Sequence, residues 1–200
     1  ESVDGILLDL GLSSFQLEDN KRGFSHKFQS SLDMRFDKNS TNNTAEKIVH
    51  QNDLKELTKI FKEYGEERHA YKIAKKIKDL NDKVDVLAIT SVVDQVTPFK
   101  YRLKTYSRIF QALRIATNDE LNHLKFFLDN FIDLLSPQGR IVVISYHSIE
   151  DRIVKHKFKD LKNKKKMNLI YKKPLIPSKE EVGLNKRARS AKMRVGEKIG

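Results

Sequence analysis

The chain has 200 residues, which is enough for one large or two small domains with ordinary hydrophobic cores. It contains no cysteine, so a disulfide framework and a cysteine-based zinc site are excluded, and no apolar run approaches the roughly 18 residues that a membrane span needs. The formal net charge is +12, and the excess lies in one place: residues 152–200 hold 17 Lys and Arg against 4 Asp and Glu, whereas residues 1–151 hold 22 against 23.

Two interpretations of the basic segment stay open. It is either a solvated, lysine-rich tail, since blocks of like charge are often disordered, or a surface that binds a polyanion. Nucleic acid fits the second interpretation best, because phosphate neutralisation gives affinity that does not depend on sequence. The first residues do not form a signal peptide and the lack of cysteine suits a reducing compartment, so we expect a cytoplasmic protein that does not bind membranes.

An apolar run from Val3 to Leu8 opens the chain and ends in a carboxylate, Asp9. A run of this kind predicts a short strand buried on both faces, as in a parallel sheet covered by helices. Polar residues from Gly11 to Gln16 follow as a loop at the carboxyl end of the strand, where open α/β sheets bind their ligands. Because the chain begins inside this strand, we expect it to be a fragment.

The polar stretch 38–44 predicts a linker, and residues from about 45 to 105 predict a series of short amphipathic helices. Thr44 or Asn43 is the expected cap of the first helix, and Asn52 or Asp53 that of the second. Further helical segments are expected after Glu66 and over Val86–Val96, the latter ending before Pro98.

Residues after about 120 return to an α/β pattern. The predicted elements are a helix over 121–135, a turn over 136–139, a buried strand over 141–144, a helix over 149–161, and a strand pair over 169–176 and 191–199. The polar residues Tyr146, His147 and Ser148 follow the second buried strand, so they should share one sheet edge with Asp9. We therefore predict an α/β fold in which residues 1–37 and 106–200 form one domain and residues 38–105 form an all-helical insertion.

Seven blocks of this sequence resemble, in the right order, the MraW/RsmH methyltransferase family. They are DGILLDLGLSSFQL at 4–17, RGFS at 22–25, LDMRFD at 32–37, YGEERHAYKIAKKI at 64–77, RIFQALRIATNDEL at 108–121, SYHSIEDRIVK at 145–155 and NKRARSAKMRV at 185–195. The resemblance implies the C-terminal half of a Rossmann-like class I methyltransferase sheet, with the helical insertion as a substrate-recognition subdomain. It also implies transfer of a methyl group from S-adenosylmethionine to the N4 amine of a cytosine in the decoding region of small-subunit ribosomal RNA.

The resemblance further implies that Asp9 and Gln16 contact the cofactor and that the partners are the ribosomal RNA or the 30S particle, with a homodimer as the assembly. Two single residues and one stretch depart from the family pattern: Phe15 stands where Pro is usual, Tyr146 replaces Phe, and Lys104–Phe110 reads KTYSRIF where HPATRTF is usual. The family's glycine-rich cofactor turn is not among these 200 residues. We therefore expect this chain to be part of the active enzyme and to bind S-adenosylmethionine weakly by itself.

Methylation of a cytosine amine needs acceptors for the amine hydrogens, because its lone pair is conjugated into the ring. Asp9 is the predicted acceptor, helped by the Leu10 carbonyl, although it could instead cap the following loop. His147 is either a general base or a hydrogen-bonded structural residue, and Ser148 either acts in catalysis or caps the next helix. No metal site is expected.

Arginine pairs bidentately with phosphate and stacks on unpaired bases, so the basic residues near the predicted site are the candidate RNA contacts. These are Arg108, Arg187, Arg189 and Arg194, together with Lys186 and Lys192. Asp33 and Arg35 are expected to form an ion pair that fixes their loop. The alternatives to the enzyme are a non-catalytic basic RNA-binding module that has lost its cofactor half, and a structural fragment without a function of its own.

Overall fold

The computed structural model describes residues 2–80 and 83–200 of the chain. By contacts within the chain it divides into two compact units, one made of residues up to Gly11 with 121–200 and one made of residues 12–120. We call them the sheet unit and the helical unit. The helical unit encloses the predicted insertion, 38–105, together with the residues on either side of it.

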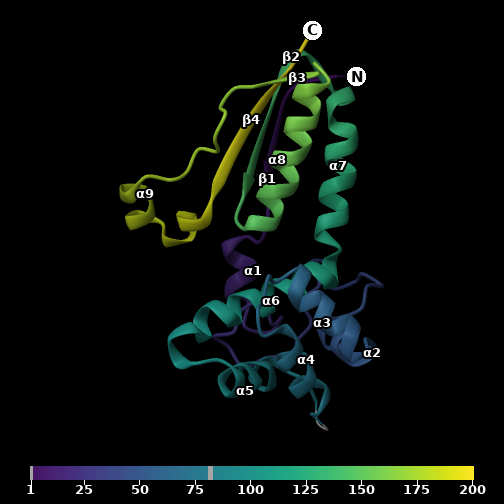
Figure 1. Ribbon diagram of the computed structural model, residues 1–200, viewed down its shortest axis with the longest axis vertical. Helices are drawn as coiled ribbons and strands as arrows, with labels where there is room; N and C mark the ends of the chain where they lie inside the picture. Colours follow the sequence, from purple (N-terminus) through teal and green to yellow (C-terminus); the bar gives the residue numbers. More distant parts are fainter. Residues whose placement is uncertain (1, 81–82) are drawn as a thin grey trace. The chain divides into compact units, whose positions relative to one another are not determined.

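The sheet unit contains a four-stranded mixed sheet with the order β1-β2-β4-β3. The first two strands are parallel, and β4 runs antiparallel to both β2 and β3. Figure 1 shows β1, β2 and β4 side by side, with helices α7 and α8 beside them. The strands are β1 (Val3–Asp9), β2 (Leu135–Ser145), β3 (Met167–Leu169) and β4 (Lys192–Lys198), and the helices are α7 (Glu120–Leu134), α8 (Ser148–Asn163) and the short α9 (Lys179–Leu184).

The prediction that β1 is buried on both faces is wrong. Ile6 and Leu8 pack against the core formed with α7 and α8, but Leu7 on the opposite face is 67% exposed and Val3 is 47% exposed. The strand also pairs on one side only, with β2, among the described residues. An apolar run therefore overstated the burial of this strand, because sequence alone does not show how many layers cover it.

Residues 136–139 form the predicted turn, which interrupts the pairing of β2 with β1. The register with β1 passes from Val3–Leu135 to Gly5–Arg140, so two steps along β1 match five along β2. Gln138 lies in the left-handed region, with φ 65°. Beyond it, Ile141 and Val143 are almost fully buried while Val142 and Ile144 are half-buried. The predicted strand is confirmed, although its burial alternates.

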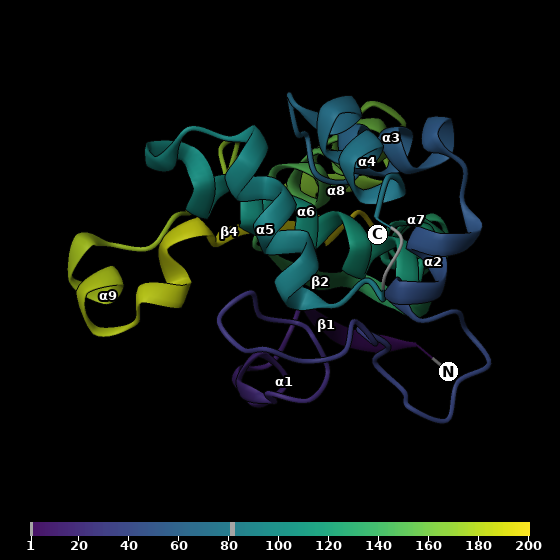
Figure 2. The same ribbon diagram turned by 90° about the horizontal axis from the view of Figure 1, so that it is seen from below.

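The predicted final strand pair is confirmed with a shorter first strand. Only Met167–Leu169 forms a ladder with β4, and Leu175 then makes a single bridge to Met193. Residues 170–190, which include α9 and the 3-10 turn η2 (Lys186–Ser190), project from the sheet (Figures 1 and 2). Eleven of the 17 Lys and Arg of residues 152–200 lie on α8 and on this projecting segment.

The helical unit is built around one buried cluster to which all of its longer helices contribute. Thr44 and Asp53 cap α2 and α3 as predicted, and Asp85 caps α5. Sequence periodicity did not single out α1 and α6, which are findings of the structure. The elements are α1 (Ser14–Glu18), α2 (Ala45–Gln51), α3 (Leu54–Glu63), α4 (Ala70–Lys78), α5 (Val86–Val96), the 3-10 turn η1 (Phe99–Tyr101) and α6 (Arg102–Asn118).

Gly65 lets α3 approach α6 closely. A Cβ atom at this position would lie 2.7 Å from the Arg108 carbonyl oxygen and 2.8 Å from that of Phe61, both of them backbone atoms. We expect Gly65→Ala to lower the free energy of unfolding by about 2–4 kcal/mol, because the backbone of one helix must shift. Urea unfolding followed by far-ultraviolet circular dichroism measures this. Gly183→Ala is the control, since its Cβ would meet no atom within 4 Å, and an equal loss in both variants would contradict the explanation.

Candidate active site at the carboxyl ends of β1 and β2

Parallel pairing of β1 with β2 brings the two predicted polar clusters to one sheet edge, as expected. Asp9 pairs in register with Ile144, and the Leu10 amide donates a hydrogen bond to the Ile144 carbonyl at 3.0 Å. One residue beyond β2, the Tyr146 hydroxyl donates to Asp9 Oδ1 at 2.9 Å. Asp9 is exposed, so this hydrogen bond holds a carboxylate that faces solvent at the end of the strand.

Gly11 lets the chain turn beside the Tyr146 ring. Its φ of +93° lies in the left-handed region, which other residues rarely adopt, and a Cβ built there would lie 3.6 Å from Tyr146 Cδ2. The chain can therefore turn away from β1 directly after Asp9 and Leu10 while the tyrosine ring lies against its backbone. The arrangement depends on glycine because of the backbone angle, rather than because of lack of space.

Tyr146 keeps its proton at any physiological pH. Burial raises the pKa of its hydroxyl to about 12, and the hydrogen bond to Asp9 and the charges of Asp9 and Glu150 act in the same direction. At neutral pH the hydroxyl is thus a fixed donor to Asp9. A carboxylate that accepts from a tyrosine is oriented on one oxygen, which leaves its charge available to a second donor.

Glu150 organises the turn between β2 and α8. It is only 3% exposed, and its Oε2 accepts hydrogen bonds from the backbone amides of Tyr146 at 3.0 Å and His147 at 3.4 Å. In return the Glu150 amide donates to His147 Nδ1 at 3.4 Å. This is a reciprocal capping box with histidine in the position usually held by serine or threonine.

The structure favours the structural role for His147 over the general-base role. Nδ1 accepts from the Glu150 amide, and Nε2 is buried 3.1 Å from Glu150 Oε1 without making a hydrogen bond, so neither ring nitrogen faces solvent. The side chain is 11% exposed. The alternative that Ser148 caps α8 is wrong, because His147 is the cap and Ser148 is the first helical residue. Ser148 is exposed, beside the turn.

Asp151 ties α8 to β4. Its Oδ1 accepts from Arg194 Nε at 2.7 Å, and its Oδ2 accepts from Lys192 Nζ at 3.3 Å. The side chains of Asp151 and Arg194 are 11% and 12% exposed. Arg194 is therefore a positioning residue in this unit, held by a carboxylate, and its predicted contact with RNA competes with that ion pair.

The stability of the sheet unit should fall in acid because of Asp151. Burial alone would raise the pKa of this carboxyl, but the hydrogen bonds and charges of Arg194 and Lys192 outweigh it and lower the pKa below its ordinary value. A lowered folded-state pKa gives stability that is present above the unfolded pKa, near 3.9, and is lost as pH falls through the folded value. We expect the unfolding free energy to fall more steeply below about pH 4 in the wild type than in Asp151→Asn. Urea titrations at a series of pH values measure both slopes; parallel curves would contradict this role for Asp151.

Gln16 lies in the helical unit, where it closes a capping box on α1. Its Oε1 accepts from the Ser13 amide at 3.0 Å and lies 3.2 Å from Ser13 Oγ, which accepts in turn from the Gln16 amide at 3.2 Å. Phe15, the departure from the family pattern, is 83% exposed. The loop after β1 is therefore a short capped helix, a feature that the Ser-Ser-Phe-Gln sequence could have shown.

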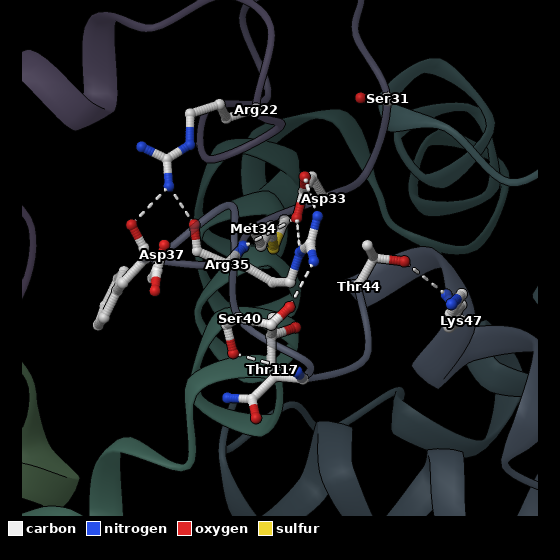
Figure 3. A network of polar contacts seen from close by, with 12 residues as sticks. Arg22, Ser31, Asp33, Met34, Arg35, Asp37, Ser40, Thr44, Lys47 and Thr117 are labelled. Carbon is white, nitrogen blue, oxygen red and sulfur yellow. Dashed lines mark hydrogen bonds and ion pairs between the residues drawn. The ribbon is translucent and has the colours of Figure 1, made fainter.

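The LDMRFD block forms a fixed loop within the helical unit. Arg35 Nε donates to Asp33 Oδ1 at 2.7 Å, which confirms the predicted ion pair. Arg22 donates to the carbonyl groups of Arg35 and Phe36 (Figure 3). Asn118 donates to the Met34 carbonyl and accepts from the Phe36 amide, each at 2.8 Å. These bonds hold the fully buried Met34 at φ 57°, a strained backbone angle.

The other predicted RNA-binding residues differ in their ion pairing and exposure. Arg108 Nη1 lies 3.4 Å from Glu67 Oε2, and Glu67 is only 3% exposed, so Arg108 neutralises a buried carboxylate of the helical unit. Arg187 and Arg189 lie on the 3-10 turn η2 and are exposed.

Sequence reasoning missed the roles of Glu150 and Asp151. The spacing of Glu150 three residues after a cap was the available signal for the first.

Within residues 2–80 and 83–200, no group of three or more His, Cys, Asp or Glu side chains is placed to hold a metal ion. No helix in this part of the chain combines the length and the apolar character needed to cross a membrane.

Comparison with known families decides the wider assignment. The model of the MraW methylase family matches residues 1–199. The chain belongs to the MraW methylase family. The mixed sheet with its flanking helices is consistent with the methyltransferase fold expected from the sequence.

Curated relatives of this MraW-family chain are similar over its whole length. It is 44% identical to the ribosomal RNA small subunit methyltransferase H of Halothermothrix orenii, over all of this chain and 70% of that protein. It is 44% identical to the protein of the same name from Caldicellulosiruptor saccharolyticus, over all of this chain and 71% of that protein. For the Trichodesmium erythraeum protein of that name the identity is 44%, over 98% of this chain and 69% of that protein.

Proposed function

We propose that this chain belongs to an enzyme that transfers a methyl group from S-adenosylmethionine to the N4 amine of a cytosine in small-subunit ribosomal RNA. The Asp9 carboxylate, held by Tyr146 at the carboxyl end of β1, is the observation that carries the proposal. The family and the names of the relatives support methylation of ribosomal RNA. The cytosine, its N4 atom and the cofactor come from the resemblance of the motifs.

The resemblance implies cofactor contacts for Asp9, in the sheet unit, and for Gln16, in the helical unit. Asp9 offers an exposed carboxylate to a cationic or hydroxyl group, and the Nε2 group of Gln16 would donate, because its Oε1 is used by Ser13. S-adenosylmethionine would supply an activated methyl group when bound. Exposed acceptor and donor groups of this kind fit its amino acid and ribose parts.

Asp9 would make the cytosine amine a better nucleophile. Its carboxylate, with the Leu10 carbonyl, would accept hydrogen bonds from the amine, which favours a pyramidal nitrogen and stabilises the positive charge that grows as the methyl group leaves the sulfonium sulfur for this nitrogen. The carboxylate would then take the proton that the methylated nitrogen loses. The target base must first leave its stack. Tyr146 and Glu150 keep the acceptor in place, since alignment supplies much of the acceleration in a transfer of this type. His147 and Ser148, the other predicted catalytic residues, would then support the turn rather than move a proton.

The projecting basic segment would bind the RNA. Arg187 and Arg189 are exposed on η2, beside Lys186. Their guanidinium groups can pair with phosphates, and such binding weakens as salt rises. Arg108 and Arg194 would contribute only if an RNA phosphate shares them with Glu67 and Asp151. The proposal places the protein in the cytoplasm, with the ribosomal RNA or the 30S particle as partner and a homodimer as the assembly.

Substitution of Asp9 tests the proposed reaction. In the complete gene product we expect Asp9→Ala to lower methyl transfer about 100-fold or more, the usual cost of losing an oriented electrostatic group, while affinity for RNA stays near that of the wild type. Small-subunit ribosomal RNA is incubated with methyl-labelled S-adenosylmethionine, digested to nucleosides, and analysed for N4-methylcytidine.

Asp4→Ala is the matched control, because Asp4 is an exposed carboxylate near the other end of β1. Full activity of Asp9→Ala would show that Asp9 does not have the proposed catalytic role.

The basic segment also favours a second candidate function, a non-catalytic RNA-binding module. Wild-type protein that binds RNA with salt-sensitive affinity and transfers no methyl group would favour that candidate.

A further inference from the structure

The start of α6 exposes an unusual set of large side chains. Phe99 is 84% exposed, Tyr101 52% and Leu103 71%. They alternate with the cations Lys100, Arg102 and Lys104, and we call residues 99–104 the FKYRLK surface. It lies at the junction of α5 and α6 in the helical unit (Figures 1 and 2). Scattered exposed apolar residues need no explanation, but three in five positions mark a surface that meets another molecule.

Each of the two aromatic rings of this surface makes a cation–π contact. Arg102 Cζ lies 5.6 Å from the centroid of the Phe99 ring, and Lys100 Nζ lies 4.9 Å from that of Tyr101. Two hydrogen bonds fix the Arg102 side chain, which donates to the Asp94 carbonyl at 2.9 Å and to the Thr97 carbonyl at 3.2 Å. The rings are thus presented by a short 3-10 turn and a fixed guanidinium, which lowers the entropy lost on binding.

The charge around the surface has one sign. Residues 95–107 contain Lys100, Arg102 and Lys104 and no Asp or Glu. The preceding carboxylate in the sequence, Asp94, is paired with Arg102 at 3.2 Å and accepts from the Tyr106 hydroxyl. Lys100 and Lys104 are exposed, so the rings lie in a locally positive field.

We infer that the FKYRLK surface is a stacking platform for unpaired bases of single-stranded RNA, an inference that deepens the proposed function by giving its substrate a second contact. Exposed aromatic faces stack on bases of any sequence, and neighbouring cations pair with the phosphates that join them. Neutral apolar partners would gain nothing from the three cations. A membrane surface is the main rival, because it also combines apolar and anionic groups.

The test measures stacking directly. The 200-residue chain is titrated with a short single-stranded oligouridine that carries one central 2-aminopurine, whose fluorescence is quenched when it stacks on an aromatic ring. We expect quenching by the wild type, and its loss in Phe99→Leu/Tyr101→Leu with affinity about fivefold weaker or more for each ring. The single variant Phe99→Tyr, with Tyr101 unchanged, should keep the quenching, because both positions still carry an aromatic ring. Circular dichroism confirms that folding is kept, as expected for exposed positions.

Phe126→Leu is the matched control. Phe126 is 73% exposed on α7 in the sheet unit, outside the FKYRLK surface, so its loss should change neither quenching nor affinity. Lys100→Gln/Lys104→Gln should keep quenching at low salt and reduce the slope of log affinity against log salt by about 1.4.

The inference would be overturned by no quenching by the wild type, by quenching retained at saturation by Phe99→Leu/Tyr101→Leu, or by an equal effect of Phe126→Leu. If Phe99→Leu/Tyr101→Leu lost binding to phosphatidylglycerol vesicles but kept its affinity for RNA, the inference would also be overturned, in favour of a membrane-binding surface. The formation of N4-methylcytidine reports on the proposed function separately, because it depends on Asp9. Undiminished methylation with unchanged stacking in the double variant would reject the platform and leave the enzyme.

Discussion

Replacing Arg194 with alanine is expected to lower the free energy of unfolding of the sheet unit by about 2–4 kcal/mol, because it leaves a buried carboxylate with one weaker partner. Asp151 is 11% exposed and would retain only Lys192, at 3.3 Å on an ammonium whose side chain is 40% exposed. The charge of Asp151 would then be poorly compensated at neutral pH. Urea unfolding followed by circular dichroism measures the loss, since the chain has no tryptophan.

The double variant Arg194→Gln/Asp151→Asn separates this cause from lost packing. It removes both charges and keeps two groups that can hydrogen-bond, so we expect it to be more stable than Arg194→Ala. Arg187→Ala is the control for a solvent-exposed arginine of the same region, with an expected change of less than about 0.5 kcal/mol. An Arg194→Ala protein as stable as Arg187→Ala would show that Arg194 is available for RNA, as the sequence first suggested.

The contrast between Arg194 and Arg187 shows where sequence reasoning ends. Charge and spacing in the block 185–195 indicated a basic cluster and could not tell an arginine on a strand from one on a projecting turn. Arg194 lies on β4 with its side chain toward the first turn of α8, whereas Arg187 lies on η2. The partner, Asp151, is 43 residues away in sequence, and only the β2–β4 pairing brings it near.

Local signals were predictable because they depend on neighbours in sequence. Val86–Val96 forms the predicted helix with the predicted end, and Thr44 and Asp53 cap their helices. The shared edge of Asp9 and Tyr146 followed from parallel strands. The exposed face of β1 did not follow, because burial depends on what covers a strand. Helix α6 was missed because its residues are buried on several sides, so they show little of the two-faced pattern on which sequence prediction relies.

Glu150→Gln should destabilise the sheet unit by about 1–3 kcal/mol although the two side chains have the same shape. Oε2 accepts from the amides of Tyr146 and His147, and Oε1 faces His147 Nε2 at 3.1 Å. Nε2 makes no hydrogen bond to Oε1, so the printed donors to this carboxylate are the two backbone amides at Oε2. Glutamine keeps one oxygen for these amides but loses the negative charge, which makes each hydrogen bond weaker.

The same substitution should release Tyr146 from Asp9. The turn that Glu150 holds positions the Tyr146 hydroxyl, and the charge of Glu150 contributes to the raised pKa of that group. We expect the pKa of Tyr146 to move from about 12 toward its ordinary value of 10. The ultraviolet absorbance of tyrosinate measures it, with Tyr146→Phe subtracted to isolate this residue from the other five tyrosines.

Glu181→Gln is the matched control, since Glu181 is an exposed residue of the first turn of α9, and it should leave both stability and the Tyr146 titration unchanged. Methyl transfer by Glu150→Gln in the complete gene product should fall with the pKa, because a displaced Tyr146 no longer orients Asp9. An unaltered titration together with reduced stability would confine Glu150 to the folding of α8 and separate it from the site. A shifted titration with full activity would instead show that Asp9 needs no support from Tyr146.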